Sequence, residues 1–397
     1  MKVSSKQVQV QAQESVALSS VGRAKIHVVS FQVPWPADYG GAIDVYYKLK
    51  VLHEAGVAPI LHTFIYGGRQ EQPKLNEICE EVHYYPRSLG WKKQCSMLPY
   101  IVATRDNERL LDNLCRDDYP ILFEGLHTCY YLDHPRLKDR RKFVRMHNIE
   151  HEYYHRLAIQ NGWNWRSLYY RIESLRLRRF ESMLTHAEAV LAITKADMQA
   201  LHNRYPDTNA IHLPCFFDTQ PLEEWKEGIE TEQFVLYHGN LAVEENARIA
   251  QYIVRQLAPQ CPGTLFVIAG RNPQIEHLPH NVKLFANPAD SHLDQLIQTA
   301  HIHLMLTKQP TGIKLKLLNT LAKGRGHIIA NREMLYGHSL GRYCVRADKT
   351  EEITRQIESI MQQPLSESAL ADRRKGLLKM RKAGISRLSL LQIGISF

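Results

Sequence analysis

The amino-acid sequence predicts an α/β protein made of two doubly wound domains, each built on a parallel sheet. Apolar, β-branched segments typical of buried strands alternate with amphipathic helical segments along most of the chain. The alternation occurs in two successive sets, and 397 residues is about the length that two such domains require. With 44% hydrophobic and 23% charged residues, the composition excludes a disordered or fibrous chain.

The first domain is expected over residues 25–216, after a flexible polar segment at 1–24. A strand at 25–34, a helix that follows Gly41 and ends at Gly56, and a strand at 57–66 form a β-α-β unit, which implies a parallel sheet with a right-handed crossover. The same patterns predict the rest of the domain: strands at 80–86, 120–126, 142–148 and 189–194, helices at 104–114, 165–186 and 197–205, and an exit segment at 210–217.

The second domain is expected over residues 217–365, and a C-terminal helix within 366–397 is expected to pack back on the first domain. Its predicted elements are strands at 232–241, 264–270, 281–287, 301–307 and 326–331, and helices at 245–258, 291–300, 314–323 and over most of 351–382. Because open parallel sheets bind ligands outside the carboxyl ends of their strands, we expect the binding site in a cleft between the two domains.

The lack of a recognisable targeting signal and the pattern of cysteines suggest a cytoplasmic protein. The first 24 residues lack the apolar core of a signal peptide, and no stretch approaches the roughly 18 apolar residues of a membrane-spanning helix. Seven scattered cysteines without a C-x-x-C pair are expected to be reduced thiols. The net charge of +9 fits a nucleic acid, an anionic membrane or phosphorylated substrates. Since no nucleic-acid-binding motif is present, we expect no nucleic-acid partner.

Two adjacent glycines, Gly40 and Gly41, come just before the first predicted helix. Glycines at this place let backbone N–H groups approach a ligand closely, and the helix dipole favours negative charge there. The alternative is a tight turn that contacts no ligand. The pattern is not G-x-G-x-x-G, which argues against a dinucleotide-dependent oxidoreductase.

Two histidines, His127 and His147, stand at the ends of predicted strands. In a parallel-sheet protein these ends face the cleft, where a histidine can bind a substrate hydroxyl or transfer a proton. His147, His151 and His155 also have the i, i+4, i+8 spacing of one helix face. They do not form H-E-x-x-H, so we expect no metal site.

A candidate phosphate site lies where the predicted helix 314–323 begins. Thr311 and Gly312 precede this helix, which opens with Lys314 and Lys316, and a helix N-terminus with a lysine is suited to a diphosphate. Lys316 and Asn319 are three residues apart and are expected to share a face, with Lys314 pointing the other way. The alternative is a solvated helix face with two ordinary lysines.

Two strands of the second domain contribute to the same edge of its sheet. Gly239 with Asn240, and Gly270 with Arg271, each lie where a predicted strand ends. Because these ends meet at one edge of a parallel sheet, they add glycine backbone and a cation to the candidate phosphate site.

The order of motifs resembles the retaining glycosyltransferases of the GT-B fold, family GT4, of the kind that assembles envelope polysaccharide and lipopolysaccharide in Bacteroidetes. It covers nearly the whole chain after residue 25, and the motifs are YGGAIDVYYKLKVLHEAGV, FEGLH, HNIEHEYY, AITKAD, YHGNL, IAGRNP and TGIKLKLLNTLAKGRGHIIA. The resemblance implies two Rossmann-like domains facing across a cleft. It further implies a glycan or lipid-linked acceptor on the N-terminal domain, a UDP- or GDP-sugar on the C-terminal domain, and no cofactor or metal.

The resemblance also assigns roles to individual residues. Gly40 and Gly41 would lie near the donor diphosphate, and His127 matches the histidine that contacts the donor sugar. His147 would lie on the acceptor side, and the two histidines are the candidate catalytic residues. Lys316 matches a lysine that precedes the family's terminal acidic residue by three positions, and Arg271 falls in the loop that helps to form the nucleotide pocket.

The sequence departs from the family at the donor site. The family's E-x7-E pair corresponds to Thr311 and Asn319, and its usual arginine and lysine after the YHGNL-type strand correspond to Asn240 and Glu245. We expect a subfamily with a rearranged donor site. The alternatives are a GT-B shell that binds or scaffolds without transferring sugar, and a sugar-nucleotide epimerase of the same fold.

The positive charge is concentrated in residues 136–179, which hold 12 Lys+Arg and 4 Asp+Glu together with several aromatic residues. Basic residues interleaved with aromatics are attracted to an anionic membrane surface, which would make the protein peripheral on the inner face of the cytoplasmic membrane. The alternative is a solvated basic helix whose aromatic residues lie in the core.

Overall fold

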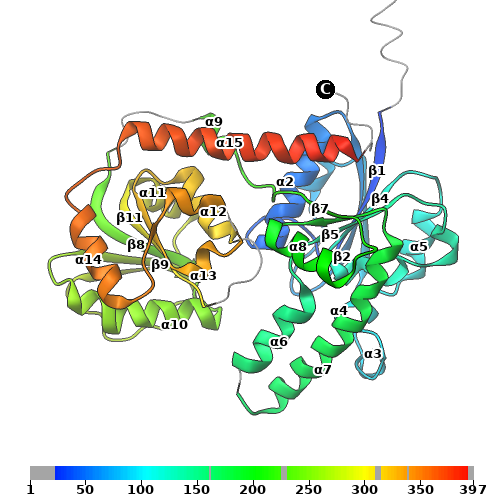
Figure 1. Cartoon of the computed structure of the whole chain (residues 1–397), viewed down its shortest axis with the longest axis horizontal. Helices are drawn as coiled ribbons and strands as arrows, with labels where there is room; N and C mark the ends of the chain where they lie inside the picture. Colours follow the sequence, from blue (N-terminus) through cyan, green and yellow to red (C-terminus); the bar gives the residue numbers. More distant parts are fainter. Residues whose placement is uncertain (1–22, 161, 225–229, 309–313, 338, 392–397) are drawn as a thin grey trace, which may run out of the picture.

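The computed structural model describes residues 23–160, 162–224, 230–308, 314–337 and 339–391. Two α/β domains lie side by side, and a long C-terminal helix runs along both of them (Figure 1). Each domain is a parallel sheet with helices packed on its faces, so the predicted architecture of two doubly wound domains is confirmed.

The N-terminal domain contains seven parallel strands in the order β3-β2-β1-β4-β5-β6-β7. The strands are β1 (Lys25–Ser30), β2 (Ala58–Ile65), β3 (Glu81–Pro86), β4 (Ile121–Glu124), β5 (Lys142–Met146), β6 (Ala189–Ala192) and β7 (Ala210–His212). The helices are α2 (Gly40–Glu54), α3 (Trp91–Gln94), α4 (Tyr100–Ala103), α5 (Glu108–Leu114), α6 (Glu150–Gln160), α7 (Trp165–Phe180) and α8 (Lys195–Arg204). The strand order reverses between β1 and β4, so the carboxyl ends of these strands are where a doubly wound sheet binds ligands.

The C-terminal domain has six strands in the order β10-β9-β8-β11-β12-β13. They are β8 (Glu232–Asn240), β9 (Leu265–Arg271), β10 (Val282–Ala286), β11 (Ala300–Met305), β12 (His327–Ala330) and β13 (Val345–Arg346). The helices around them are α9 (Gln220–Glu223), α10 (Glu244–Tyr252), α11 (Asp290–Thr299), α12 (Leu315–Lys323), α13 (Arg332–Leu335) and α14 (Thr350–Ile360). In sequence order this is the 3-2-1-4-5-6 arrangement of dinucleotide-binding sheets, with its switch point between β8 and β11.

Some predicted helices differ from the observed ones. The helix predicted at 104–114 is shorter in the structure, where α5 covers only Glu108–Leu114; α4 ends at Ala103, and residues 104–107 are not helical. The helix predicted at 245–258 is α10 followed by a π-helical turn at Ile253–Leu257 and a 3-10 turn that contains Pro259, because proline cannot donate the hydrogen bond that would continue the helix. Helix α6 is not among the predicted helices.

The final helix, α15 (Glu367–Leu390), contacts both domains. Near its start, Arg373 is buried and donates hydrogen bonds to the carbonyls of Gly324 and Gly326 in the C-terminal domain. Near its end, Leu388 lies in the hydrophobic core of the N-terminal domain, and Arg387 donates to the carbonyl of His212. One helix therefore fixes how the two sheets face each other.

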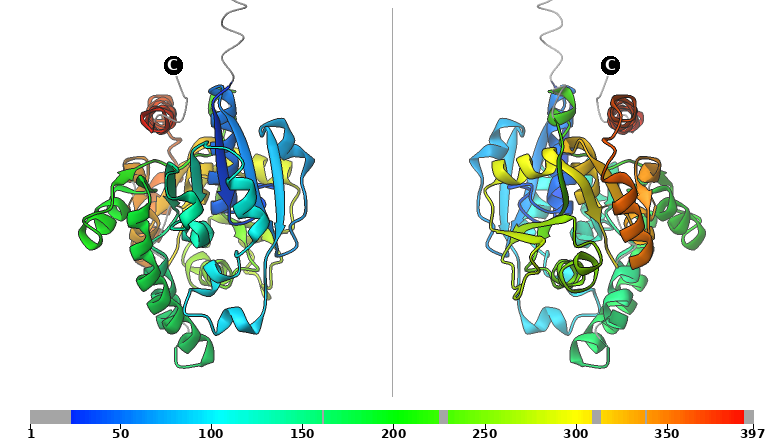
Figure 2. Two further views of the ribbon diagram at one scale, coloured as in Figure 1. Left: turned by 90° about the vertical axis from the view of Figure 1, so that its right-hand side faces the viewer. Right: turned by 90° about the vertical axis from the view of Figure 1, so that its left-hand side faces the viewer.

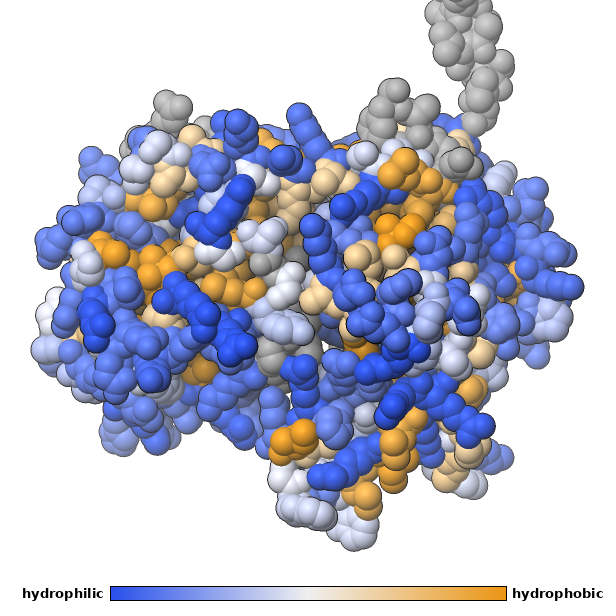
Figure 3. Space-filling model, viewed as in Figure 1, coloured by the Kyte–Doolittle hydropathy of each residue, from blue (hydrophilic) through white to orange (hydrophobic). Residues whose placement is uncertain are grey.

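Helices α6 and α7 form a hairpin that projects from the N-terminal domain, away from both sheets (Figures 1 and 2). The hydroxyls of Ser167 and Ser174 on α7 donate to the carbonyls of Ala158 and His151 on α6, both at 2.7 Å. Apolar side chains gather on the exposed surface of this hairpin (Figure 3). The described residues include no helix that is long and apolar enough to cross a membrane.

Candidate functional site

The N-terminal half of the site is an aromatic cluster at the carboxyl ends of β1, β4 and β5. The ring of Phe31, just after β1, lies 5.3 Å from the ring of His127 and 5.5 Å from that of His147. Gly125, between β4 and His127, has φ = +76°, and a Cβ atom there would meet Nδ1 of His127 at 3.0 Å. The structure thus brings together the two histidines selected from the sequence.

A buried network of charged groups lies beneath this cluster. On α2, Lys48 donates to Asp44 at 3.1 Å and to both oxygens of Glu124 at 2.7 and 2.9 Å, while Arg145 on β5 binds Asp44 through two nitrogens at 3.0 and 3.1 Å. Burial alone would raise the pKa of Asp44, but Arg145 and Lys48 hold it well below its usual range. His147 joins the network through Nε2, which lies 3.0 Å from Glu124. The network therefore holds the imidazole of His147 in one orientation.

His127 is placed to interact with a ligand through a ring nitrogen that no described protein group uses. Its Nδ1 atom is buried and has no hydrogen-bond partner among the described residues. Burial, together with the positive charge of Arg105, lowers the pKa of His127 well below its usual value, so the ring is neutral at pH 7. Arg105 in turn donates to the carbonyl of Phe31 at 2.8 Å. A neutral imidazole in this position can exchange a hydrogen bond with a hydroxyl group.

Gly40 and Gly41 begin α2 where the two domains meet. A Cβ atom on Gly40 would lie 3.5 Å from Leu315 of α12, in the other domain, so the N-termini of α2 and α12 face each other. A Cβ atom on Gly41 would lie 2.5 Å from the ring of Phe31. Glycine is therefore needed at position 41 because the ring of Phe31 packs against it. This explanation differs from the two alternatives considered from the sequence, a turn that contacts a ligand and a tight turn that contacts none.

The C-terminal half of the site centres on Lys316, in the first turn of α12. Its ammonium group lies 3.9 Å from the centre of the Tyr237 ring and has no hydrogen-bond partner among the described residues. A Cβ atom on Gly239 would lie 3.4 Å from this nitrogen. Burial lowers the pKa of Lys316 to about 7, against a smaller opposite effect of Glu245. A buried amine beside a glycine strand end is a ready partner for an anion.

Lys314 and Lys316 both interact with the charge of Glu245, which raises the pKa of each lysine. Helix α12 begins at Leu315, and Lys314 is its N-cap residue with non-helical backbone angles, so the helical spacing does not apply to it. Burial lowers the pKa of Lys314 to about 8, while Glu245 raises it and Arg156 of α6 lowers it. Both lysines and the α6 helix therefore border one region between the domains.

Glu245, which stands where the family has a lysine, supports the end of β11. Its Oε1 atom accepts hydrogen bonds from the hydroxyl of Thr307 and, at 2.8 Å, from the backbone N–H of Lys308. The carboxylate thus holds the segment after β11 and places a negative charge near the two lysines.

The other predicted donor-site residues border the same cleft with fewer contacts. Asn240 caps the turn after β8, where its side-chain oxygen accepts from the N–H of Ala242 at 3.1 Å. Arg271 is exposed and lies 3.8 Å from Asp38 of the N-terminal domain, so this pair spans the cleft. Asn319 is half-buried on α12. Thr311 and Gly312 lie outside the described residues.

The three histidines at i, i+4, i+8 do not come together. His147 precedes α6 and binds Glu124, whereas His151 is paired with Glu181 at 2.7 Å. Asp44, Glu124 and His147 do offer ligand atoms within 4.8 Å of one another. Lys48 already occupies the two carboxylates, so these residues form an ion-pair network and do not fit a metal ion.

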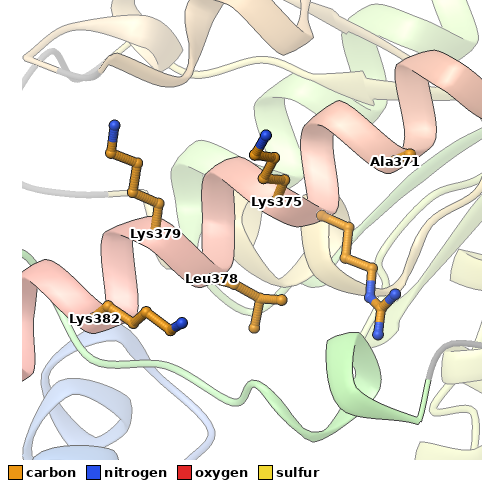
Figure 4. A pocket seen from close by; sticks show the side chains of 6 residues that line it. Ala371, Lys375, Leu378, Lys379 and Lys382 are labelled. Carbon is orange, nitrogen blue, oxygen red and sulfur yellow. The ribbon is translucent and has the colours of Figure 1, made fainter.

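A second basic region lies along α15, where a hollow of about 440 Å³ is lined by Ala371, Arg374, Lys375, Leu378, Lys379 and Lys382. Lys375 and Lys379 point to one side of the helix, and Lys382 points to the other (Figure 4). Since the ammonium groups do not converge on one point, this hollow is a weaker anion site than the surroundings of Lys316.

Sequence reasoning missed the groups that support the site. Asp44 and Lys48 are spaced i, i+4 on a helix and look like an exposed pair, although both are buried. Their position could have indicated a role, because both lie soon after Gly41 in the helix that begins at the predicted cleft. Nothing in the local sequence of Phe31 indicates its place between the two histidines.

The GT-B fold is shared with known proteins of low sequence identity. An α,α-trehalose-phosphate synthase from Burkholderia xenovorans is 12% identical with a TM-score of 0.60, over 93% of this chain and 99% of that one. Sucrose-phosphate synthase from Thermosynechococcus elongatus is 13% identical with a TM-score of 0.66, over 93% and 98%. TarM is 10% identical with a TM-score of 0.64, over 94% and 99%. These similarities confirm the predicted fold.

Among curated sequences, an uncharacterized 44.6 kDa protein in the cps region of Klebsiella pneumoniae is 24% identical over 382 residues. The alignment covers 86% of this chain and 96% of the relative. No family model matches the sequence.

Proposed function

We propose that the protein is a glycosyltransferase that moves a sugar from a UDP- or GDP-sugar to a glycan or lipid-linked acceptor. The observation that carries this proposal is the Lys316 amine, which is buried beside Gly239 where α12 begins and has no hydrogen-bond partner among the described residues. Burying an unsatisfied amine costs stability, and the diphosphate of a nucleotide sugar supplies the missing partner.

Two similarities support the same function. Trehalose-phosphate synthases are among the structural neighbours, and one of them was solved with UDP-2-fluoro glucose. The Klebsiella relative is described as a protein in the cps region. Together with the resemblance to family GT4, these favour envelope polysaccharide or lipopolysaccharide synthesis, with retention of the anomeric configuration and without a metal.

In the proposed mechanism the bond between the anomeric carbon and the diphosphate oxygen breaks while an acceptor hydroxyl attacks from the same face. The departing diphosphate takes the hydroxyl proton, so no protein group needs to change its charge. Lys316, Arg271 and the N-terminus of α12 stabilise the negative charge of the leaving group. His127 binds a hydroxyl of the donor sugar, and His147, held by Glu124, orients the acceptor hydroxyl.

The direct test is a binding screen with UDP-, GDP- and ADP-sugars, with and without Mg²⁺, read by thermal shift and calorimetry. At least one donor is expected to bind without metal, and Lys316→Met is expected to weaken it. Lys323→Met is the matched control, because Lys323 lies at the other end of α12 and is paired with Asp294 at 2.6 Å. If no donor stabilises the wild-type protein, the proposal is wrong.

The second candidate is a GT-B shell that binds nucleotide sugars without transferring the sugar. Thr311 and Asn319 favour it, because the resemblance places the family's two carboxylates at these positions. Donor binding without transfer to any acceptor or to water would identify the shell. Conversion of a UDP-sugar to its epimer with no acceptor present would identify an epimerase.

A further inference from the structure

The exposed surface of the α6–α7 hairpin is apolar where a soluble helix is normally polar. Trp165, Leu168, Ile172 and Leu175 follow one another at intervals of three, four and three residues and therefore line one face of α7, which we call the hairpin stripe. All four side chains are exposed, and Trp165 is 86% exposed. Trp163, in the loop between the helices, is 96% exposed.

The face of α7 that is directed toward the protein carries buried polar and apolar groups. Ser167, Glu173 and Ser174 are buried, and Glu173 accepts a hydrogen bond from the backbone N–H of Tyr100 at 2.7 Å. Leu177 and Phe180 are buried on the same helix, so the inner face of α7 has its own apolar contacts, while the side chains of the hairpin stripe remain exposed.

A second exposed apolar segment lies beside α7. Around α3, Trp91 is 71% exposed and Met97 is 78% exposed. Arg176 on α7 donates to the carbonyl of Gln94 at the end of α3 at 2.9 Å, so the two segments adjoin. A second group of exposed apolar side chains therefore lies next to the helix that carries the hairpin stripe.

Arginines lie on the same helix as the hairpin stripe. Between residues 153 and 180 there are six arginines and a single acidic residue, the buried Glu173. Arg171, Arg178 and Arg179 are exposed on α7, and Arg171 lies 5.3 Å from the centre of the Trp163 ring. Exposed tryptophans flanked by arginines match an anionic lipid surface, since indole rings sit at the bilayer interface and arginines bind phosphate head groups.

In the structure, some arginines of the basic patch expected at 136–179 are engaged within the domain and do not belong to the exposed surface of the hairpin. Arg140 and Arg141 are paired with Asp117 and Glu188, and Arg145 is buried on Asp44. These residues belong to the fold of the sheet. The expected alternative, a basic helix with its aromatics in the core, is wrong for Trp163 and Trp165 because both are exposed.

We propose that the α6–α7 hairpin, with α3 beside it, docks on an anionic bilayer surface. A second copy of the chain fits less well, because a symmetric contact between two hairpin stripes would bring their arginines together.

Membrane docking would also define the kind of acceptor, an inference that rests on the proposed function. Helix α6 begins three residues after His147 and, with 11 residues, is about 16 Å long. The acceptor would then carry its hydroxyl roughly that far above the membrane, as a lipid-linked glycan can.

The test is co-sedimentation of the full-length protein with vesicles of phosphatidylcholine alone and of phosphatidylcholine with phosphatidylglycerol at roughly 7:3, in about 50 mM and about 500 mM NaCl. Binding is expected only to the anionic vesicles and is expected to weaken at high salt. Arg171→Gln, Arg178→Gln and Arg179→Gln together are expected to reduce partitioning on the order of 100-fold, and Trp163→Ser with Trp165→Ser by roughly tenfold or more.

The matched control is Lys375→Gln, Lys379→Gln and Lys382→Gln on α15, which removes the same charge from the other basic surface and is expected to leave binding unchanged. Equal loss in this control, equal binding to neutral vesicles, or no binding at low salt would overturn the proposal. So would dimers in sedimentation velocity that the Trp163 and Trp165 changes dissociate. Donor binding measured on the same variants is expected to be unchanged, so failure of the membrane contact and failure of the proposed function remain distinguishable.

Discussion

Lys316 gives the most specific prediction, because its buried amine has no hydrogen-bond partner in the described part of the chain and burial lowers its pKa to about 7. An anion that binds this amine raises its pKa, so donor binding takes up a proton. From that pKa the free protein has about half of its Lys316 amines neutral at pH 7 and about nine tenths at pH 8, so uptake from this group is about 0.5 and 0.9 protons. Donor affinity is therefore expected to be constant below pH 7 and to fall as the pH rises above it.

The assay is calorimetric donor titration at pH 6, 7 and 8 in two buffers of different ionisation enthalpy, which separates proton uptake from the heat of binding. Lys316→Met is expected to lose this proton uptake and most of the affinity. Any uptake that remains near pH 8 belongs to Lys314, whose pKa is about 8. Lys323→Met is expected to keep the wild-type linkage, because that lysine is paired with Asp294.

The same substitution separates a binding role from a structural one. Replacing an unsatisfied buried amine with a methionine is expected to stabilise the unliganded protein at pH 7 by about 1–3 kcal/mol. The pKa of Lys316 is lower in the folded than in the unfolded protein, so charging this amine destabilises the wild-type fold. The destabilisation is greatest at and below pH 7 and becomes smaller as the pH rises toward the unfolded-state pKa of 10.5. Lower stability of the variant in urea, or unchanged proton uptake, would refute the reasoning.

Three further predictions concern the fold that supports the site. Lys48→Met is expected to destabilise the protein by about 3–5 kcal/mol in urea unfolding because it removes the ammonium group paired with the buried carboxylate of Glu124, whereas Lys50→Met, at an exposed pair, is expected to stay within about 0.5 kcal/mol. Burial lowers the pKa of His212 to about 4 and that of His303 to about 3. Each histidine is therefore expected to reduce the free energy of unfolding by about 1.4 kcal/mol per pH unit as the pH falls from 6.5 to its folded-state pKa. His303→Leu is expected to flatten the pH dependence of the free energy of unfolding, measured in urea. Gly41→Ala is expected to lower the melting temperature and weaken donor binding, because the new methyl group would clash with the phenyl ring packed there; unchanged melting and binding would contradict this.

The fold and the edges of the sheets could be predicted because they follow from local patterns. His127 and His147 were identifiable because the carboxyl ends of parallel strands share one edge, and the structure places both beside Phe31. The charged network could not be predicted, since Lys48 and Glu124 are 76 residues apart and their pairing depends on tertiary packing.

The errors also have physical causes. Helical spacing does not apply to Lys314, because this residue precedes helix α12. Trp163 and Trp165 could be expected in a core from their size, yet their exposure depends on how far the hairpin projects, which sequence periodicity does not report.

The changes at the donor site are best understood as one rearrangement. The resemblance places the lost carboxylates at Thr311 and Asn319, on the segment that leads into α12 and on α12 itself, while a carboxylate that the family does not have appears at Glu245 on α10. This carboxylate raises the pKa of Lys316 against the larger effect of burial, so it helps to keep the amine charged. A chain that no longer bound an anion would gain stability by replacing the buried amine with an apolar residue. The presence of Lys316 and of a nearby carboxylate that supports its charge therefore favours a rearranged donor site over a decayed one.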